Sequence, residues 1–430
     1  MLDMNWIREN KELVRNTAAW KRVDFPLDEL LAWDDKRRLL RRETEQHRAE
    51  RNGLTKEVEQ LLRQGDAAAG EQAKEQVRKL NSRLAVLEAD LAEADRRCGE
   101  LQLLAPNPVS ADTPIGRDDS ENVELRRTGT LPEFSFAPRD HVELGELHGI
   151  LDIPRGVKAG GPRSYVLKNA GLYLHLAVQR LALDVLAERG FTSMDVPVIV
   201  RPEALERTGF FPGGKDQTYE LNGENRWLAG TSEVSLVSLY SDEIVELDEP
   251  MRLAGMSACF RREVGSAGRD VRGLYRVHQF SKIEQVVLCK NNPDTSEQML
   301  QEILANAEYI LQLLELPYRI VAVCSGDMSL KTHKQYDVET WMPSREAFGE
   351  THSASNLLDF QARRSNIRYR DEHGRLQYCH TLNNTAVATP RILIPLLENH
   401  QQEDGSIYIP AALRKYMNGL ERLEVPQRNK

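Results

Sequence analysis

The chain has 430 residues, of which 29% are charged and 40% are hydrophobic, and its formal net charge is −9. This length exceeds the usual single-domain range and the composition is typical of a globular protein, so we expect two domains. The opening residues, MLDMNWIRENKELV, carry charges throughout and lack the apolar run of a signal peptide. The chain also lacks the roughly eighteen consecutive apolar residues of a membrane span. These features predict a cytoplasmic protein with no membrane partner.

The cysteines are few and scattered, at Cys98, Cys259, Cys289, Cys324 and Cys379. Their number is odd and no two of them form a C-x-x-C pair. Neither a disulfide framework nor a thiolate zinc site is indicated by this spacing. We therefore expect reduced thiols and no zinc.

Residues 27 to about 104 have the pattern of a long helical hairpin. From Leu80 to Leu101, apolar positions recur in alternating steps of four and three, as in a helix that packs along a partner helix. An upstream stretch follows the same spacing, although polar residues interrupt it. Between the two stretches, QGDAAAG at 64–70 supplies the small residues of a tight turn. We predict an antiparallel hairpin within an N-terminal domain of residues 1–104.

The first half of this hairpin is basic although the whole chain is acidic. Residues 36–63 contain nine basic and five acidic side chains, a net charge of +4. A polyanion is a reasonable partner for such a surface. A solvated coiled-coil face, whose charges only maintain solubility, is an equally good interpretation of the pattern.

A linker and a second domain follow the hairpin. Residues 105–124 are rich in Pro, Ser, Asn and Asp, which predicts a linker before a domain of residues 125–430. Helical spacing occurs at 172–190 and 296–316. Strand-like runs occur at 191–200, 251–260, 282–289, 318–324, 336–343 and 375–382. Many strands with few interposed helices predict an α+β fold on a mainly antiparallel sheet.

Five arginines lie within FRREVGSAGRDVRGLYRVHQF, residues 260–280. They are Arg261, Arg262, Arg269, Arg272 and Arg276. Because a guanidinium cannot lose its charge, burying it requires carboxylates or phosphates as partners. A salt-bridge network with Glu263, Asp270 and Glu284 is one solution, and an anionic ligand is the other. On a strand, Arg261 and Glu263 would share one face, as a nucleotide site on an open sheet requires.

This stretch, together with Phe280, Lys282 and Glu284, resembles motif two of the class II aminoacyl-tRNA synthetases, in the form found in seryl-tRNA synthetases. The resemblance extends over nearly the whole chain. TSE at 231–233 resembles the T-x-E serine loop of that family, with Ser232 where Ala is usual. GETHSASNLLDFQARRSNIRYR resembles the stretch that ends in its D-F-Q-A-R-R signature.

The C-terminal part resembles motif three of the same family. The matching stretch is LNNTAVATPRILIPLLENHQQEDGSI. Thr385 stands where many members have Ser, and Ala388-Thr389-Pro390 replaces the commoner A-V-G before the arginine. The conjunction of all these stretches is highly specific, whereas any one of them alone would be weak.

The resemblance implies an architecture and a set of partners. The hairpin resembles the family's tRNA-binding arm, and Arg38, Arg41, Arg42 and Arg48 are the residues implied to contact tRNA(Ser). Pro197, which follows a long predicted helix, matches the motif-one proline of a homodimer interface. We therefore expect a helical arm joined to a class II synthetase domain in a homodimer. Transfer to tRNA(Sec), where a cell has it, is also expected.

For ATP, the resemblance implies roles for named residues. Arg261 would bind the α-phosphate, and Arg391 would bind the γ-phosphate and cover the adenine, tasks that suit planar guanidinium forks. Phe280 would stack under the base and Glu263 would accept from its exocyclic amine. Arg262 and Val277 complete the implied ATP site. Arg261, Glu263 and Arg391 form the implied catalytic set.

The resemblance also implies a metal site and a serine site. Glu350 and Ser353 match the positions that hold the catalytic ion, a pair of hard oxygen donors suited to Mg²⁺ or Mn²⁺. For L-serine, Thr231 and Glu233 would bind the ammonium, while Glu284 and Thr385 would meet the side-chain hydroxyl. Asn383 is also implied in the serine site.

The implied reaction is ATP-dependent formation of seryl-adenylate, followed by transfer of the seryl group to the 3′ end of tRNA. Catalysis would rest on positioning and on charge stabilisation by arginine and metal. A synthetase-like paralogue that serves a carrier protein or a biosynthetic pathway is one alternative, and the hairpin disfavours the carrier version because that version has no use for a tRNA arm. A non-catalytic nucleic-acid-binding relative is the other, disfavoured by intact Arg261, Glu263, Glu284, Glu350 and Arg391.

Overall fold

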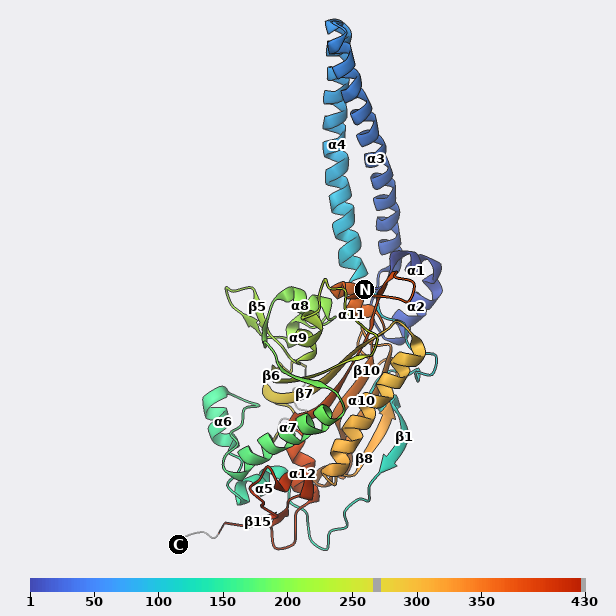
Figure 1. The fold of residues 1–430 in the computed structure, drawn as a ribbon. Coiled ribbons are helices and arrows are strands. Elements are labelled where there is room, and N and C mark those ends of the chain that lie inside the picture. The colour runs from blue at the N-terminus through green and yellow to red at the C-terminus, as the bar shows by residue number, and fades with distance from the viewer. Residues whose placement is uncertain (266–271, 427–430) are drawn as a thin grey trace. The chain divides into compact units, whose positions relative to one another are not determined.

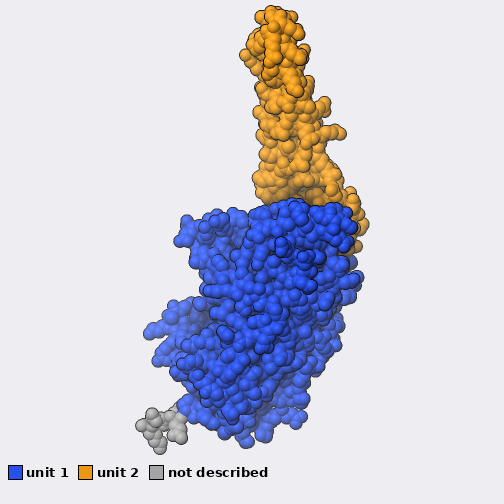
Figure 2. All heavy atoms as spheres, in the orientation of Figure 1, with its two compact units in different colours: residues 1, 20–22, 107–430 blue, residues 2–19, 23–106 orange. Residues whose placement is uncertain are grey.

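The computed structural model describes residues 1–265 and 272–426. Contacts divide the chain into two compact units, coloured separately in Figure 2. One unit comprises residues 2–19 and 23–106, and the other comprises residues 1, 20–22 and 107–430. Arg269 and Asp270, two residues of the arginine-rich stretch, lie outside the described residues.

The smaller unit is a helical hairpin on a short helical base. Its helices are α1 (Met4–Glu9), α2 (Lys11–Trp20), α3 (Leu27–Arg63) and α4 (Ala67–Gln102). The two long helices α3 and α4 run side by side (Figure 1). The turn between them uses Gly65 at φ +80°, and Asp66 caps α4 by accepting from the Ala69 backbone N–H. This confirms the predicted hairpin.

The hairpin is held by apolar and ionic contacts. Leu84, Leu87, Ala94, Cys98 and Leu101 of the predicted seam are buried. Asp34 is fully buried as well, with ion pairs to Arg8 at 2.6 Å and Arg38 at 2.9 Å and a further pair to Arg37. Burial by itself raises the pKa of Asp34, but the hydrogen bond from Arg8 and the charges of Arg37 and Arg38 outweigh it and lower the pKa. Arg38, implied in tRNA binding, therefore also has a structural partner.

The larger unit is built on one mixed sheet, in the order β1-β8-β9-β10-β13-β7-β6-β2 among the described residues. Its strands are β1 (Val123–Thr128), β2 (Thr192–Asp195), β6 (Met251–Phe260), β7 (Gln279–Cys289), β8 (Tyr318–Ala322), β9 (Lys334–Met342), β10 (Ala347–Asn356) and β13 (His380–Thr389). Every pairing is antiparallel except that of β2 with β6. This confirms the predicted α+β fold on a mainly antiparallel sheet.

Three helices cover one face of this sheet: α7 (Ala170–Glu188), α10 (Pro293–Leu313) and α12 (Leu393–Asn399) (Figure 1). The main hydrophobic core lies between these helices and the strands. Leu174 and Val178 of α7, and Ile303 of α10, pack there against Ile283 and Leu382 of the sheet. Burial of such side chains contributes about 1.5–3 kcal/mol each. The opposite face remains available for a site.

Short elements complete the larger unit. The helices are α5 (His141–Leu147), α6 (Ile153–Gly160), α8 (Pro202–Arg207), α9 (Glu233–Ser238), α11 (Phe360–Ser365) and α13 (Ala411–Arg414), with 3₁₀ turns η1 (Asp119–Glu121), η2 (Lys215–Gln217) and η3 (Pro343–Arg345). The minor strands are β3 (Ile199–Val200), β4 (Glu220–Leu221), β5 (Arg226–Leu228), β11 (Arg368–Arg370), β12 (Leu376–Tyr378), β14 (Ile407–Tyr408) and β15 (Arg422–Leu423).

Bulges interrupt the sheet where candidate site residues lie. The β10–β9 register shifts between Glu350 and His352, and the β13–β7 register shifts between Thr385 and Val387. A third shift occurs in β1 beside β8. Bulges locally change the direction in which side chains point, and they are common next to active sites.

The expected strand placement of Arg261 and Glu263 is wrong. Strand β6 ends at Phe260, and Glu263 adopts the left-handed conformation with φ +53°. The two residues are therefore not i and i+2 on one strand. They nevertheless both line one cavity.

Candidate active site

The open face of the sheet carries a cavity of about 310 Å³ between the strands and the loops above them. It brings together most of the residues implied by the family resemblance. They are Thr231, Glu233, Arg261, Glu263, Val277, Phe280, Glu284, Glu350, Ser353, Asn383, Thr385 and Arg391. Arg262 does not line it; that residue is exposed, and its backbone N–H donates to the carbonyl of Gln217.

Two buried Lys–Glu pairs form the polar floor of the cavity. Lys331 Nζ lies 2.6 Å from Glu233 Oε1, and Lys282 Nζ lies 2.5 Å from Glu284 Oε2. Burial lowers the pKa of Lys331, although the charge of Glu233 opposes this effect. Burial likewise raises the pKa of Glu284, against the opposing charge of Lys282. The pairing of opposite charges is what makes four buried ionisable groups tolerable here.

Glu284 has an unused acceptor. Within the described part of the chain, no group donates a well-aligned hydrogen bond to its buried Oε2, despite the nearby Lys282 ammonium. A carboxylate oxygen has two lone pairs, so Oε2 can accept from a further donor besides the Lys282 ammonium. A ligand hydroxyl in the cavity would supply that donor. Thr385, directly opposite Glu284 in the β13–β7 register, lines the same cavity.

Glu233 is held from two sides. Its Oε1 accepts from Lys331 and, at 2.7 Å, from Gln361 Nε2, while Gln361 Oε1 accepts from Thr381 Oγ1 at 2.8 Å. The Lys331 ammonium lies 3.8 Å from the centroid of the Phe210 ring, which also lines the cavity. These contacts fix the Glu233 carboxylate before any ligand arrives.

Lys331, Phe210 and the role of Gln361 were not predicted from the sequence. Lys331 belongs to a loop whose backbone carbonyls, at Ser329 and Leu330, accept from the buried Lys21 ammonium at 3.1 Å each. Because Lys21 and Lys331 are about three hundred positions apart, no local pattern could have found this arrangement. Gln361 stood within the recognised D-F-Q-A-R-R stretch, and that stretch was the available signal.

Ser232, the departure from the usual alanine, has a local explanation. Its side chain is buried, and its hydroxyl donates to the carbonyl of Gly255 at 3.1 Å. A side chain at position 255 would meet Ser232 Oγ at 2.8 Å, so the larger residue fits because its neighbour on β6 is glycine. The hydroxyl thus bonds the scaffold.

The arginines of motifs two and three lie over aromatic rings. The Arg261 guanidinium lies 5.3 Å from the Phe280 ring centroid, and that of Arg391 lies 4.6 Å from the Tyr275 ring. Arg391 Nε also donates to the Tyr275 carbonyl at 3.0 Å. Glu263 pairs with Arg276 at 3.3 Å. Two fixed guanidinium forks beside an aromatic ring are suited to a nucleotide with its phosphates.

Carboxylates gather beside Arg391. Glu350 Oε2 lies 3.7 Å from Arg391 Nη1, and Ser353 hydrogen-bonds the buried Asp337. Burial, followed by the negative charge of Glu350, raises the pKa of Asp337 well above its ordinary value. Burial, followed by the negative charges of Asp119 and Glu350, raises the pKa of Asp327. Hard oxygen donors that repel one another fit a divalent cation, which would relieve the repulsion.

Comparison with known proteins places the chain among relatives of known activity. The profile of the seryl-tRNA synthetase N-terminal domain matches residues 1–109, and that of the tRNA synthetase class II core domain (G, H, P, S and T) matches residues 217–400. A serine–tRNA ligase of Deinococcus radiodurans is 47% identical over 429 residues, which covers 100% of both chains.

Solved structures agree. A seryl-tRNA synthetase of Pyrococcus horikoshii, in complex with ATP, superposes with a TM-score of 0.91 at 35% identity, covering 99% of this chain and 100% of the other. A cytoplasmic serine–tRNA ligase of Naegleria fowleri, in complex with AMP, gives a TM-score of 0.87 at 27% identity over 99% of each chain. The likeness therefore includes both units.

Proposed function

The chain belongs to the seryl-tRNA synthetase family, and we propose from its geometry how its residues serve the reaction of that family. Its activity is that of a serine–tRNA ligase, as the motifs predicted: ATP activates L-serine, and the seryl group passes to tRNA. What remains to be assigned is the role of each side chain. The observation that carries the assignment is the unsatisfied Glu284 Oε2 in the same cavity as Arg261 and Arg391.

Serine would bind across the two Lys–Glu pairs. The Glu233 carboxylate, fixed by Lys331 and Gln361, would take the ammonium together with Thr231. The serine hydroxyl would donate to Glu284 Oε2, with Thr385 and Asn383 closing the subsite. The serine carboxylate would then face Arg261, the residue proposed for the α-phosphate.

The chemistry would need no covalent enzyme intermediate. A serine carboxylate oxygen attacks the α-phosphorus of ATP, the new P–O bond forms as the bond to the bridging oxygen breaks, and pyrophosphate leaves with that electron pair. Arg261 and Arg391 would stabilise charge on the phosphates, with Phe280 and Glu263 on the base. In the second step a ribose hydroxyl of tRNA attacks the acyl carbon, and AMP leaves.

Glu350 and Ser353 are the proposed ligands of Mg²⁺ or Mn²⁺. The support is the oxygen-rich set beside Arg391, including the buried Asp337 behind Ser353. Such an ion, when bound, neutralises phosphate charge. Asp337 would hold the Ser353 hydroxyl in place, since the two are hydrogen-bonded.

Residues 1–104 are proposed to act as the tRNA arm, 105–124 as the linker and 125–430 as the catalytic domain. Of the four arginines implied in tRNA contact, Arg41 and Arg48 are 55% and 51% exposed, and Arg42 is exposed too. Arg48 is paired with Glu88 at 2.7 Å, so tRNA phosphates would have to compete with that carboxylate. Exposed pairs of this kind are weak, about 0–1 kcal/mol.

Helix α7 supports a homodimer. By length and composition alone this helix could cross a membrane, but half of it is buried within the protein. Its outer side exposes Leu172, Tyr173 and Leu176, not far in the chain from Pro197. We assign this exposed apolar stripe to an interface with a second copy. A cytoplasmic location follows from the substrates, ATP and tRNA.

Serine-dependent exchange of pyrophosphate into ATP, followed by charging of tRNA(Ser), tests the assignment. The purified chain should exchange with serine and with no other amino acid at a comparable rate. Exchange that is independent of serine, or absent altogether, would contradict it.

A further inference from the structure

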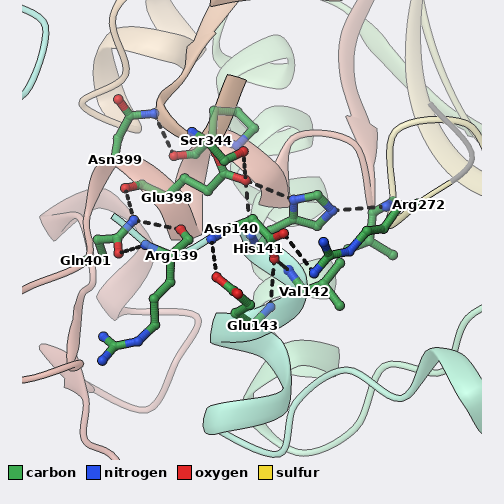
Figure 3. A network of polar contacts seen from close by, with 12 residues as sticks. Arg139, Asp140, His141, Val142, Glu143, Arg272, Ser344, Glu398, Asn399 and Gln401 are labelled. Atoms are coloured by element: carbon green, nitrogen blue, oxygen red, sulfur yellow. Dashed lines mark hydrogen bonds and ion pairs between the residues drawn. The ribbon is translucent and has the colours of Figure 1, made fainter. Parts of the chain in front are cut away.

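A buried polar network lies outside the cavity and connects four segments of the larger unit (Figure 3). At its centre is Glu398 of α12, which is fully buried. It accepts from His141 Nδ1 at 2.9 Å, from the His141 backbone N–H at 3.0 Å, and from both the backbone N–H and the hydroxyl of Ser344 at 3.0 and 2.9 Å. Four donors converge on one carboxylate, which fits its ionised form.

The other side of the His141 ring meets motif two. The backbone N–H of Leu274 donates to His141 Nε2 at 3.2 Å. Nε2 must therefore carry no proton, and the ring proton lies on Nδ1, where Glu398 accepts it. Glu398 thus selects the tautomer that lets His141 accept from motif two. An ion pair of Asp140 with Arg272 at 2.9 Å joins the same two segments.

The fit at this contact is close. Gly273 has φ +85°, and a Cβ at that position would lie 2.0 Å from His141 Nε2. Leu274 and Tyr275 are both buried. The chain therefore passes too close to the imidazole to leave room for a side chain at position 273, which must be glycine.

The next residue after Leu274, Tyr275, contacts the candidate active site. The Tyr275 carbonyl accepts from Arg391 Nε at 3.0 Å, and the Tyr275 ring lies 4.6 Å from the Arg391 guanidinium. Arg391 is the residue proposed for the γ-phosphate. We propose that His141, held in one tautomer by Glu398, is a positioning residue that fixes Leu274 and Tyr275 and through them orients Arg391 for ATP. This inference rests on the proposed role of Arg391.

The network does not include the serine subsite. Glu284, Glu233 and their lysines lie on β7, α9 and the 329–332 loop, and the described contacts of His141 and Glu398 include none of them. Loss of the His141 contact should therefore change the response to ATP and leave the response to serine unchanged.

Two variants of His141 separate its two contacts. In His141→Asn the side-chain amide nitrogen takes the place of Nδ1. It therefore keeps the hydrogen bond to Glu398, but the buried Leu274 N–H loses its acceptor. In His141→Gln the longer amide reaches Leu274, and its oxygen can accept. We expect H141N to raise KM for ATP and lower kcat in pyrophosphate exchange, by about tenfold or more combined, with KM for serine within about twofold. H141Q should restore most of the loss.

A matched control is His400→Asn. His400 is buried in the same unit and bonds the Leu314 carbonyl at 2.9 Å, away from motif two. H400N should lower the melting temperature as much as H141N does without changing KM for ATP. The proposal is overturned if H141N and H141Q lose equal activity, if KM rises for both substrates together, or if H400N reproduces the ATP effect. A wild-type protein without serine-dependent exchange would instead refute the proposed function.

Discussion

In the proposed function, single side chains decide which amino acid the cavity accepts. Glu284 and Glu233 are both buried glutamates paired with lysine, yet they differ in one respect. Glu233 Oε1 accepts hydrogen bonds from both Lys331 and Gln361, whereas Glu284 Oε2 has, among the described residues, only the Lys282 ammonium at 2.5 Å, and that contact is not a well-aligned hydrogen bond. In the proposed function, the hydrogen bonds of Glu233 are therefore in place before serine binds, and the serine hydroxyl adds one to Glu284.

This asymmetry predicts how Glu284→Ala behaves. The wild-type protein should reject alanine by about 10⁴-fold or more relative to serine, because alanine leaves Glu284 Oε2 unpaired. Glu284→Ala should lower kcat/KM for serine by about 10²-fold or more and remove most of the discrimination. Pyrophosphate exchange with each amino acid measures both effects. Arg414→Ala, which removes a guanidinium that lies over Tyr408 outside the cavity, serves as the control. Alanine activation within about tenfold of serine in the wild type would refute the role.

At the scale of elements, the local sequence pattern predicted the helices and strands whose main role is to pack in the core. The helix at 172–190 was predicted from its apolar spacing and is observed as Ala170–Glu188, because its inner side is buried in the core. Strand β10 was not among the predicted strands. Its sequence, AFGETHSASN, is polar because one of its faces carries site residues, so the alternation of a half-buried strand is obscured.

Other errors arose where distant segments set the geometry. Strand β6 ends at Phe260, and Glu263 is left-handed, because of neighbours such as Gln217. The Gln217 side-chain amide donates to the Val264 carbonyl and accepts from the Val264 backbone N–H. The position of Lys331 depends on Lys21. Resemblance to a family named the residues of the cavity, but it could not supply these long-range supports. Where local propensity and tertiary contacts disagree, tertiary contacts prevail.

Strand β10 carries a pH-sensitive residue. His352 is buried; its Nε2 donates to the Ala386 carbonyl at 3.1 Å, and its Nδ1 lies 2.8 Å from Thr351 Oγ1. Burial, opposed by that carbonyl and assisted by the charge of Arg391, lowers the pKa of His352 to about 4. The unfolded state then binds the proton first. Stability is fully present above pH about 6.5 and is lost as the pH falls toward 4.

We expect this histidine to contribute up to about 3 kcal/mol of acid destabilisation between pH 6.5 and 4. Denaturant unfolding at several pH values, for wild type and His352→Gln, measures the slope of stability against pH. The variant should have a shallower slope. Part of the slope should remain, because other buried histidines, among them His380 with its pKa lowered to about 4, also oppose protonation. Parallel slopes for the two proteins would contradict this assignment.

Helix α7 makes a prediction about assembly. Tyr173 and Leu176 are 54% and 51% exposed on its outer side. Leu176→Arg places a charge in the proposed interface, which should dissociate the dimer because burying an unpaired charge is costly. Sedimentation velocity should then give a monomer. Leu147→Arg, at an exposed apolar residue of α5, is the matched control and should leave the dimer intact. A wild-type monomer at micromolar concentration would refute the interface.

At the scale of the whole molecule, the two units carry different sets of the proposed functional residues. All residues that line the cavity belong to the larger unit, whereas the basic arginines lie on α3 of the smaller one. Activation and tRNA binding are thus separable in principle. The helical hairpin and the motif-two stretch could both be identified from the sequence, because a hairpin seam is a local pattern and motif two is a continuous one.

Replacing about residues 30–102 by a short Gly-Ser bridge should leave serine activation almost unchanged and abolish transfer to tRNA. Binding of tRNA to the intact protein should weaken steeply with salt, since each phosphate contact releases counterions. The slope should flatten when Arg38, Arg41, Arg42 and Arg48 are neutralised. Neutralising Arg96, which lies on α4 between Glu93 and Glu100, is the control. If the shortened protein still charges tRNA unaltered, the arm does not bind tRNA and its charges only maintain solubility.

The bulge in β1 has a consequence for the behaviour of the protein at high concentration. Among the described residues, β1 is the outermost strand of the sheet, and no strand pairs with its outer row of backbone donors and acceptors. It also exposes Val123 and Leu125. Such an edge can template the addition of a strand from another chain and so start aggregation. The register shift between Glu124 and Arg126, together with the charges of Glu124, Arg126 and Arg127, opposes that addition. The protein can thereby keep an open sheet edge without self-association there at high concentration.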